Sequence, residues 1–484
     1  MYIARLRLLG IAIIIVVLAF LSACQPVADA AITPTSTTVP NSNPLKLNPT
    51  ESNPVSTPNK TVPITVNHGD LDGVKIKMWH PWTGATLSVL RTLVDQFNQQ
   101  NEWGIHVMEA SQGSSGSLYS TLKTSIDQDE DIPNLIVAPI DQVLALQQDG
   151  LQVVNLHDYV YNSQWGLTAE ELADIPTNFL NQDFIEDIQL ALPAQRNAAV
   201  LFYNQSWARE LGFPNPPETM DDFKQQSCAA AKALMHDADK QNDGLGGWIV
   251  NNEALTILSW MKVFGVSKLP DVDISDYQFQ SAPARNMFKY FGQLFDEGCI
   301  WNSRNPEPYE YFARRQALFY SATVQDVIIQ AEKNRLLQID DEWTILAYPV
   351  SEKKPVVLMS GPSYAIAEST PEQQLACWIF VRWMLRPDNQ TRIVMSSASI
   401  PVSATAVNQL STFGQKYPAW QQAISWIPIA QSSPRSADWR LARGVLEDSF
   451  WQYLQPQPTP QSRANPLPDV DQTIKEILGK KNHE

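Results

Sequence analysis

The stretch Val74-Lys75-Ile76-Lys77-Met78, continued by Trp79-His80-Pro81-Trp82-Thr83-Gly84, decides the fold class of this chain. Its first five residues alternate between apolar and charged side chains, a pattern that predicts a β-strand. Apolar residues then recur at helical spacing from Leu87 to Phe97, which predicts a helix directly after the strand. A strand followed by a helix is the repeating unit of an α/β sheet.

The same order of strand and helix recurs further along the chain. Residues 105–108 predict a second strand and residues 118–126 a second helix. The continuous apolar run at 134–138 is typical of a parallel strand buried on both faces, and a helix is expected at 141–150. This alternation predicts an α/β fold with an open parallel sheet and flanking helices.

The N-terminus predicts export. Arg5 and Arg7 precede an apolar run at 8–21, which is short for a membrane span of about 20 residues and typical of a signal peptide. The run ends in Leu21-Ser22-Ala23-Cys24, which resembles a bacterial lipobox, so we expect a signal peptide at 1–23 and lipidation of Cys24. A plain signal peptide with an incidental cysteine is the alternative. Residues 24–72 are rich in Pro, Thr, Ser and Asn and predict a disordered tether.

Composition limits the partners. The 484 residues are 44% hydrophobic and 18% charged, which indicates a globular protein with enough chain for two cores. The formal net charge of -16 disfavours nucleic acids and anionic lipid surfaces, because both require a basic footprint. It fits an exported protein that handles neutral or cationic solutes.

Three cysteines remain after Cys24. Cys377 lies in an apolar helical pattern, and we expect a buried free thiol there. Cys228 falls within a predicted helix and Cys299 follows Gly298 at a helix end. Because export permits disulfides, we predict a Cys228–Cys299 bond.

Motifs for catalysis and metal binding are weak. The sequence contains no G-x-S-x-G, no H-E-x-x-H and no phosphate loop, and its six histidines are scattered. Residues 237–244 fit the first half of a calcium loop, but Val250 stands where the bidentate glutamate belongs, so we favour a solvated loop. We therefore expect no enzyme activity, no cofactor and no metal site, although a glycosidase carboxylate pair stays open.

From 74 to beyond 402 the chain resembles the family 1 extracellular solute-binding proteins, which include maltose-binding protein. The opening strand with Trp79 through Gly84 resembles the family's start, and residues 132–139 resemble its "x-P-D-L" strand. Residues 192–204 and 211–223 resemble the first hinge crossing and the helix after it, although Met220 replaces the usual Trp. Residues 315–321, with Gln316 for a small residue, precede a return crossing at 360–366 and a third at 400–402.

The resemblance implies two α/β lobes of the periplasmic-binding-protein-like II fold, joined by a hinge of several strands. Our boundaries are 73–194 with 362–400 for lobe 1 and 195–361 with 401–455 for lobe 2, followed by a surface tail at 456–484. It also implies a carbohydrate receptor that closes on its solute and delivers it to an ABC permease. The receptor is expected to be a monomer that touches the membrane through its lipid anchor alone and binds no nucleic acid.

Ligands of open α/β sheets bind outside the carboxyl ends of the strands, so residues at those ends are the candidate contacts. The candidates are Trp79, Trp82, Gln112, Ser114, Asp141, Arg196, Tyr203, Trp248, Asn251, Trp260, Tyr320 and Tyr364. Structural alternatives stand beside several of them, because a tryptophan, Tyr203 or Trp260 can be core, Arg196 can form an ion pair, and Asp141 can cap its helix. A polyamine, a peptide or glycerol phosphate is the alternative solute, and a lipid-anchored polysaccharide hydrolase the alternative function.

Overall fold

The computed structural model describes residues 64–267, 269, 279–303, 307–349, 355–456 and 470–481. All of them belong to one compact unit. The predicted signal peptide and the predicted lipidation site, Cys24, lie outside the described residues. Within the described ranges, no helix combines the length and the apolar character that crossing a membrane requires.

The first sheet, which we take as the core of lobe 1, contains the stretch that opens the globular chain. Its strand order is β2-β1-β3-β13-β6, with β1 parallel to β2 and β3, and β13 antiparallel to β3 and β6. The strands are β1 (Lys75–His80), β2 (His106–Ser111), β3 (Leu135–Ala138), β6 (Leu192–Pro193) and β13 (Ser363–Ile366). Ile76, Met78 and His80 of β1 are buried and the residues between them are not, so the predicted alternation is confirmed.

The second sheet, the core of lobe 2, is mixed. Its order is β14-β12-β7-β10-β8-β9, and β11 also pairs with β7. The strands are β7 (Asn197–Asn204), β8 (Trp248–Ile249), β9 (Ile300–Trp301), β10 (Phe319–Thr323), β11 (Trp343–Leu346), β12 (Leu358–Ser360) and β14 (Gln431–Ser432). Strands β9, β8 and β10 are mutually parallel, so their carboxyl ends meet at one edge. A separate hairpin joins β4 (Phe184–Ile185) to β5 (Ile188–Gln189).

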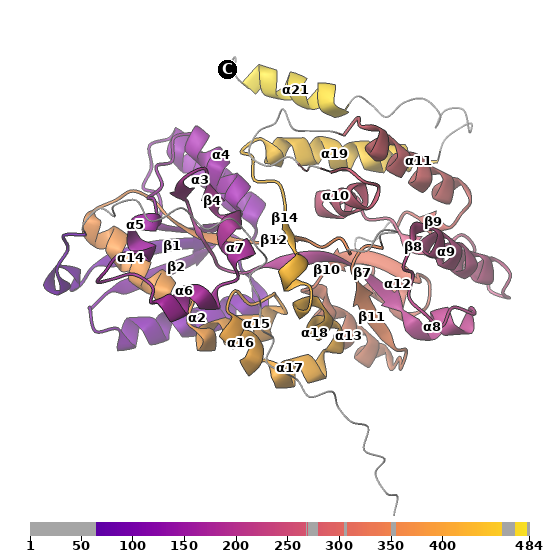
Figure 1. Ribbon diagram of the computed structural model, residues 1–484, viewed down its shortest axis with the longest axis horizontal. Coiled ribbons are helices and arrows are strands. Elements are labelled where there is room, and N and C mark those ends of the chain that lie inside the picture. Colours follow the sequence, from indigo (N-terminus) through magenta and orange to yellow (C-terminus); the bar gives the residue numbers. More distant parts are fainter. Residues whose placement is uncertain are drawn as a thin grey trace, which may run out of the picture. The chain divides into compact units, whose positions relative to one another are not determined.

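Helices cover both sheets (Figure 1). Around lobe 1 they are α2 (Gly84–Gln100), α3 (Ser115–Asp127), α4 (Ile140–Gln148), α5 (His157–Val160), α6 (Ala169–Asp174), α7 (Thr177–Gln182), α14 (Pro371–Met384) and α15 (Pro387–Ser397), with the short η1 (His68–Leu71). The first half of lobe 2 adds α8 (Gln205–Glu210), α9 (Met220–Met235), α10 (Ala254–Val263), α11 (Ala282–Asp296), α12 (Tyr309–Ala313) and α13 (Asp326–Leu337). The C-terminal part contributes α16 (Ala404–Gln409), α17 (Ser411–Lys416), α18 (Pro418–Ile424), η3 (Ile427–Ile429), α19 (Trp439–Tyr453) and α21 (Val470–Lys481).

The chain crosses between the sheets at two adjacent places. The first crossing joins β6 to β7 and the second joins β12 to β13, and Ala194 N donates to Pro362 O at 3.0 Å between them. A third segment pairs with the first, since Arg196 and Ile400 form an isolated antiparallel bridge. These contacts build the predicted multi-strand hinge, while the exact lobe boundaries stay a prediction.

Two terminal segments differ from the expectations. The tether was predicted to run to residue 72, but Val66 and Leu71 are buried in the core that contains β1, so the fold begins before that residue. The tail at 456–484 was predicted to lie on the surface, but α21 packs along α19 and buries Val470 and Ile474. Both segments are mainly polar in composition, and the few apolar side chains that dock them were therefore not weighed in the prediction.

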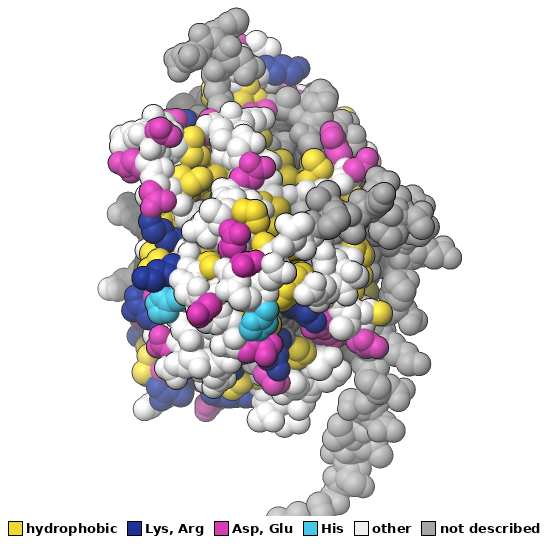
Figure 2. Space-filling view, turned by 90° about the vertical axis from the view of Figure 1, so that its left-hand side faces the viewer, with side chains coloured by type: hydrophobic (Ala, Val, Ile, Leu, Met, Phe, Trp, Pro, Cys, Tyr) yellow, Lys and Arg dark blue, Asp and Glu magenta, His cyan; other side chains and the backbone are white. Residues whose placement is uncertain are grey.

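Cys228 on α9 and Cys299 after α11 form a disulfide, with Cα atoms 4.2 Å apart, and Cys377 is a buried free thiol. Acidic and basic side chains are interspersed over the face shown in Figure 2, which is typical of a solvated surface.

Candidate functional site

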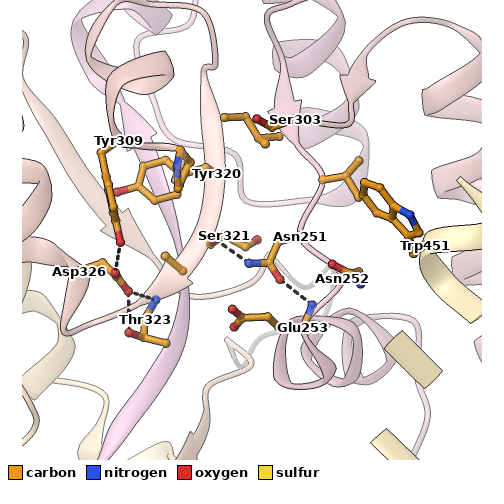
Figure 3. Close-up of a pocket in the computed structure, with 14 residues that line it drawn as sticks. Asn251, Asn252, Glu253, Ser303, Tyr309, Tyr320, Ser321, Thr323, Asp326 and Trp451 are labelled. Atoms are coloured by element: carbon orange, nitrogen blue, oxygen red, sulfur yellow. Dashed lines mark hydrogen bonds between the residues drawn. The ribbon is translucent and has the colours of Figure 1, made fainter. Parts of the chain in front are cut away.

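A cavity of about 410 Å³ lies in lobe 2 at the carboxyl ends of β8, β9 and β10 (Figure 3). This is the edge of an α/β sheet where solutes bind. Its wall consists of residues that follow these strands, of the starts of α10, α12 and α13, and of α19. The lining residues are Ile249, Val250, Asn251, Asn252, Glu253, Ser303, Pro308, Tyr309, Tyr320, Ser321, Ala322, Thr323, Asp326 and Trp451.

The turn between β8 and α10 fixes the amide side of the cavity. Asn251 Nδ2 donates to Ser321 O at 3.1 Å, and its Oδ1 accepts from Glu253 N at 2.8 Å. Glu253 stands at the N-cap of α10, and Asn252 Nδ2 lies 3.5 Å from Glu447 O of α19. Asn251 therefore holds the turn that presents Asn252 and Glu253 to the cavity.

The opposite wall is organised by Asp326 at the first turn of α13. Its Oδ2 accepts from the backbone N and the Oγ1 of Thr323 at 2.9 and 2.7 Å, and its Oδ1 accepts from Tyr309 Oη at 2.5 Å. Tyr320 donates its hydroxyl to Gln330 at 2.9 Å and is almost fully buried, so it supports the wall from behind.

The charge of the cavity is negative. The pKa of Glu253 is raised because the cavity walls limit its hydration and because Asp326 and Glu447 carry like charge nearby. No lysine or arginine is among the lining residues. Carboxylates, amides and hydroxyls beside the rings of Tyr309 and Trp451 suit a neutral or positively charged solute with an apolar face.

Three of the residues predicted for lobe 1 lie at the carboxyl ends of its strands. Trp79 is half-buried at the end of β1, and Gln112 N donates to His80 O at 2.8 Å just after β2. Ser114 is exposed and caps α3, since its Oγ accepts from Ser117 N at 3.0 Å. These residues remain candidates for contacts from lobe 1.

Trp82 was also predicted to line lobe 1, but the structure buries it beside the hinge. Its Nε1 donates to Gln195 Oε1 at 2.6 Å, and its backbone N donates to His80 Nδ1 at 3.2 Å. His80 must then carry its proton on Nε2, which faces Glu109 Oε2 at 2.9 Å, and burial lowers the pKa of this histidine. The buried ring of Tyr364 lies 6.4 Å from that of Trp82. Trp82 and Tyr364 therefore pack beside the hinge and are buried there, away from any ligand.

Four further predicted contacts are core residues. Tyr203, Trp248 and Trp260 are at most 1% exposed and belong to the core of lobe 2, where the two indole rings lie 5.9 Å apart. Arg196 is fully buried and pairs with Asp183 at 2.8 Å. Its guanidinium also donates to Gln195 O and Pro362 O, so it fastens two hinge crossings. The prediction that these four residues contact a ligand is wrong, because their side chains are almost wholly buried.

Of the twelve predicted contacts, Asn251 and Tyr320 line the cavity. Sequence reasoning missed Asn252, Glu253, Asp326 and Trp451. The two polar residues after Asn251 and the acidic start of a helix after β10 were usable signals, since both follow strands that end at the same edge. Asp141 is buried on α4, a helix that contacts α19.

The loop at 237–244 satisfies its own carboxylates. Asp237 Oδ1 accepts from Asp239 N at 2.8 Å, and Asp239 Oδ1 accepts from Gln241 N at 2.9 Å. Across the described ranges, the one cluster with metal-ligand spacing is Cys228, Glu297 and Cys299, whose sulfurs are joined in the disulfide.

Comparison with known proteins gives a consistent result. The sequence model of the bacterial extracellular solute-binding proteins matches residues 92–422. No curated protein sequence matches the chain significantly.

Solved structures share the fold at low sequence identity. The sugar-binding protein MalE from Xanthomonas citri has a TM-score of 0.69 and 17% identity, over 84% of this chain and 98% of that one. The cyclic α-maltosyl-1,6-maltose-binding protein of Arthrobacter globiformis has a TM-score of 0.65 and 16% identity, over 83% and 96%. UgpB from Mycobacterium tuberculosis, solved with glycerophosphocholine, has a TM-score of 0.65 and 13% identity, over 84% and 97%. These likenesses confirm the predicted two-lobed α/β fold.

Proposed function

From the premise that this chain belongs to the bacterial extracellular solute-binding protein family, we propose that it captures a carbohydrate and delivers it to an ABC permease. Members of the family are binding proteins that work with such importers. The carbohydrate and the delivery step are our proposal for this chain.

The cavity of lobe 2 is the observation that carries the proposal. A sugar presents an apolar C–H face and a rim of hydroxyls, which require an aromatic surface beside hydrogen-bonding groups. Trp451 and Tyr309 supply the rings, and Asn252, Ser303 and Glu253 supply donors and acceptors. An anionic solute such as glycerol phosphate requires convergent arginine or lysine side chains, which the lining residues lack.

Capture follows from the hinge. A solute that touches both lobes binds their closed arrangement better and shifts the population toward it. Lobe 2 contributes the cavity, and Trp79, Gln112 and Ser114 are the proposed contacts from lobe 1. No bond of the solute is made or broken in this scheme, so the chain acts as a receptor and not as an enzyme.

A cationic solute is the second candidate, and one observation favours it. Glu253, Asp326 and Glu447 place three carboxylates at or near the cavity, and the pKa of Glu253 is raised first by its burial and then by repulsion from the other two. An ammonium group would relieve this repulsion. A polyamine therefore belongs in any screen of solutes.

Export and anchoring complete the proposal. The family is extracellular, and the lipobox-like Leu21-Ser22-Ala23-Cys24 supports our proposal of a monomer that is lipid-anchored to the outer face of the cell membrane, or facing the periplasm if the cell has two membranes. Lipid attachment at Cys24 is tested by the mass of the mature N-terminal peptide, which gains a diacylglyceryl group and acyl chain if the assignment is right.

The solute is tested by thermal unfolding of the full chain in a detergent without a sugar head group. Sugars, polyols, polyamines, peptides and glycerol phosphate are added singly. A true ligand stabilises the folded state by RT ln(1 + [L]/Kd), about 2.7 kcal/mol at one hundred times Kd. Trp451→Ala should abolish the shift, whereas Trp103→Ala, which removes a half-buried indole of lobe 1 away from the cavity, should keep it. A shift with polyamines and none with any sugar would replace the carbohydrate by the cationic candidate.

A further inference from the structure

Helix α19 is anchored in lobe 2. The residues Trp439, Ala442, Leu446 and Phe450 recur at helical spacing and are buried in the lobe 2 core. The ring of Phe450 lies 5.5 Å from that of Phe288 on α11. The helix therefore moves with lobe 2.

A neighbouring face of α19, about 100° around the helix from the buried one, carries charged side chains and faces the carboxyl edge of lobe 2 along its C-terminal half. Arg440, Arg443, Glu447 and Trp451 are separated by three, four and four residues, so they share one face of the helix. Glu447 Oε1 accepts from Ala254 N, the first residue of α10, at 3.0 Å. Trp451 lines the cavity. This half of the helix is part of the proposed solute site.

The N-terminal half of the same face reaches lobe 1. In Figure 1, α19 runs from beside α4 to beside α11, and it contacts both helices. The guanidinium carbon of Arg440 lies 4.4 Å from the centre of the Tyr119 ring on α3. Tyr119 in turn donates to Asp149 Oδ2 at 2.9 Å. One helix face thus touches both lobes.

Asp141, in the first turn of α4, is left without a full set of partners at this contact. It is 7% exposed, and its Oδ2 accepts no hydrogen bond from the described residues, nor does Oε1 of the neighbouring Gln142. Burial raises the pKa of Asp141 to about 6, and the charge of Arg443 is the strongest influence that opposes this rise.

Arg443 of α19 also has unused hydrogen-bonding capacity. Its guanidinium makes no hydrogen bond within the described part of the chain, yet its charge acts on both Asp141 of lobe 1 and Glu447 of its own helix. A buried carboxylate oxygen without a donor is costly, and a guanidinium is the donor that best satisfies it. The two groups lie on helices that are in contact, Arg443 on α19 and Asp141 on α4, so each is the nearest candidate partner that we assign to the other.

We propose that Arg443 and Asp141 form a contact that holds the lobes together around bound solute, with α19 linking the cavity to lobe 1. The inference rests on the proposed capture by hinge closure. Arg443 and Asp141 are positioning residues, because neither touches the solute. The contact forms only in the closed arrangement, so its main effect is to slow release of the solute.

The test compares Arg443→Gln, Asp141→Asn and the double variant in the full chain, with Arg335→Gln as the control. Arg335 lies on α13, is exposed and pairs with Glu332 of its own helix. Stopped-flow tryptophan fluorescence gives the two rate constants for the solute found by thermal unfolding. We expect each single variant to release solute about 10-fold faster, because a charge-assisted hydrogen bond contributes about that factor or more. The double variant should be no worse than either single one, and Arg443→Lys should recover part of the loss.

A second arm needs no solute. Spin labels at Gln99→Cys on α2 and Lys289→Cys on α11 report the separation of the lobes through exposed sites. The parent should contain a short-distance population that Arg443→Gln depletes and Arg335→Gln leaves intact.

The two arms separate two kinds of failure. Release rates equal to the parent's in both single variants, or additive effects in the double variant, overturn the Arg443–Asp141 contact and leave the receptor function standing. If no solute binds the parent chain, the proposed function fails, and the distance distributions alone decide whether the contact exists.

Discussion

The buried arginine of the hinge yields the sharpest quantitative prediction. Arg196→Gln removes the guanidinium that pairs with Asp183 at 2.8 Å, in a place where both side chains are at most 1% exposed. Asp183 is then left as an unpaired charge in the interior. We expect the free energy of unfolding to fall by about 3–5 kcal/mol, as for other buried pairs that lose one partner.

The same magnitude follows from proton uptake. The variant can avoid the buried charge by protonating Asp183. At pH 7 this protonation costs a free energy of about 4 kcal/mol for a carboxyl whose unfolded pKa is about 3.9. Burial already raises the pKa of Asp183 in the parent, and loss of Arg196 raises it further. A raised folded-state pKa makes the folded state gain relative stability on acidification. The deficit of the variant should therefore shrink by about 1.4 kcal/mol per pH unit, from pH 7 down to the parent's own pKa for Asp183.

Urea unfolding followed by tryptophan fluorescence, at pH values from 5 to 8, measures both quantities. Arg382→Gln is the matched control, because Arg382 pairs with Glu171 at 2.8 Å with about a third of each side chain exposed. It should cost no more than about 1 kcal/mol. Arg196→Gln combined with Asp183→Asn should recover stability, since no charge stays buried. An Arg196→Gln deficit as small as the control's, or one independent of pH, would show that Asp183 is not left as an unpaired buried charge.

Three further predictions concern other parts of the fold. Gly361→Ala places a Cβ 2.3 Å from Gln195 O between two hinge crossings, so thermal unfolding should occur at lower temperature. An unchanged midpoint would show that the two crossings can move apart without loss of stability. Cys228→Ser opens a loop of 71 residues and should cost about 4 kcal/mol in urea unfolding, and a loss below 1 kcal/mol would mean that the bond restrains little. Ile474→Ala in α21 should cost about 2–4 kcal/mol, against less than about 0.5 kcal/mol for the 37%-exposed Ile477→Ala, and equal costs would deny that α21 is docked.

Local patterns predicted much of the fold. The alternation in β1 and the continuous apolar run of β3 are determined by which faces the sheet buries, and both patterns are present in single segments. The family resemblance then supplied the crossings, because the order of strands in a sheet depends on contacts between distant segments. No local pattern shows, for example, that β13 pairs with β3 across more than two hundred residues.

The residues of the candidate site were harder to predict, for a physical reason. Trp248 and Trp260 occur near strand ends, as ligand-stacking residues do, but an indole serves equally well in a core. Which use applies depends on the surrounding helices, and here Phe223 and Phe291 enclose both rings. Trp451 was missed for the converse reason, since its exposure to the cavity depends on which side of α19 faces lobe 2.

For charged residues, too, the sequence could not distinguish a ligand contact from a structural role. The position of Arg196 at a crossing suited either a ligand contact or an ion pair, and its partner Asp183 lies on a different segment. The docking of α21 could have been predicted from the sequence, because Val470, Ile474 and Leu478 recur every four residues and so form one apolar face of a helix. The proline-rich run before them masked this pattern.

The most direct test of the receptor assignment is a calorimetric titration of the full chain with the solute that raises its unfolding temperature, followed by chemical analysis of the recovered solute. We expect one solute per chain, an unaltered solute after incubation, and loss of binding in Trp451→Ala. A cleaved or modified solute would contradict the assignment as a receptor, and full affinity in Trp451→Ala would contradict the site.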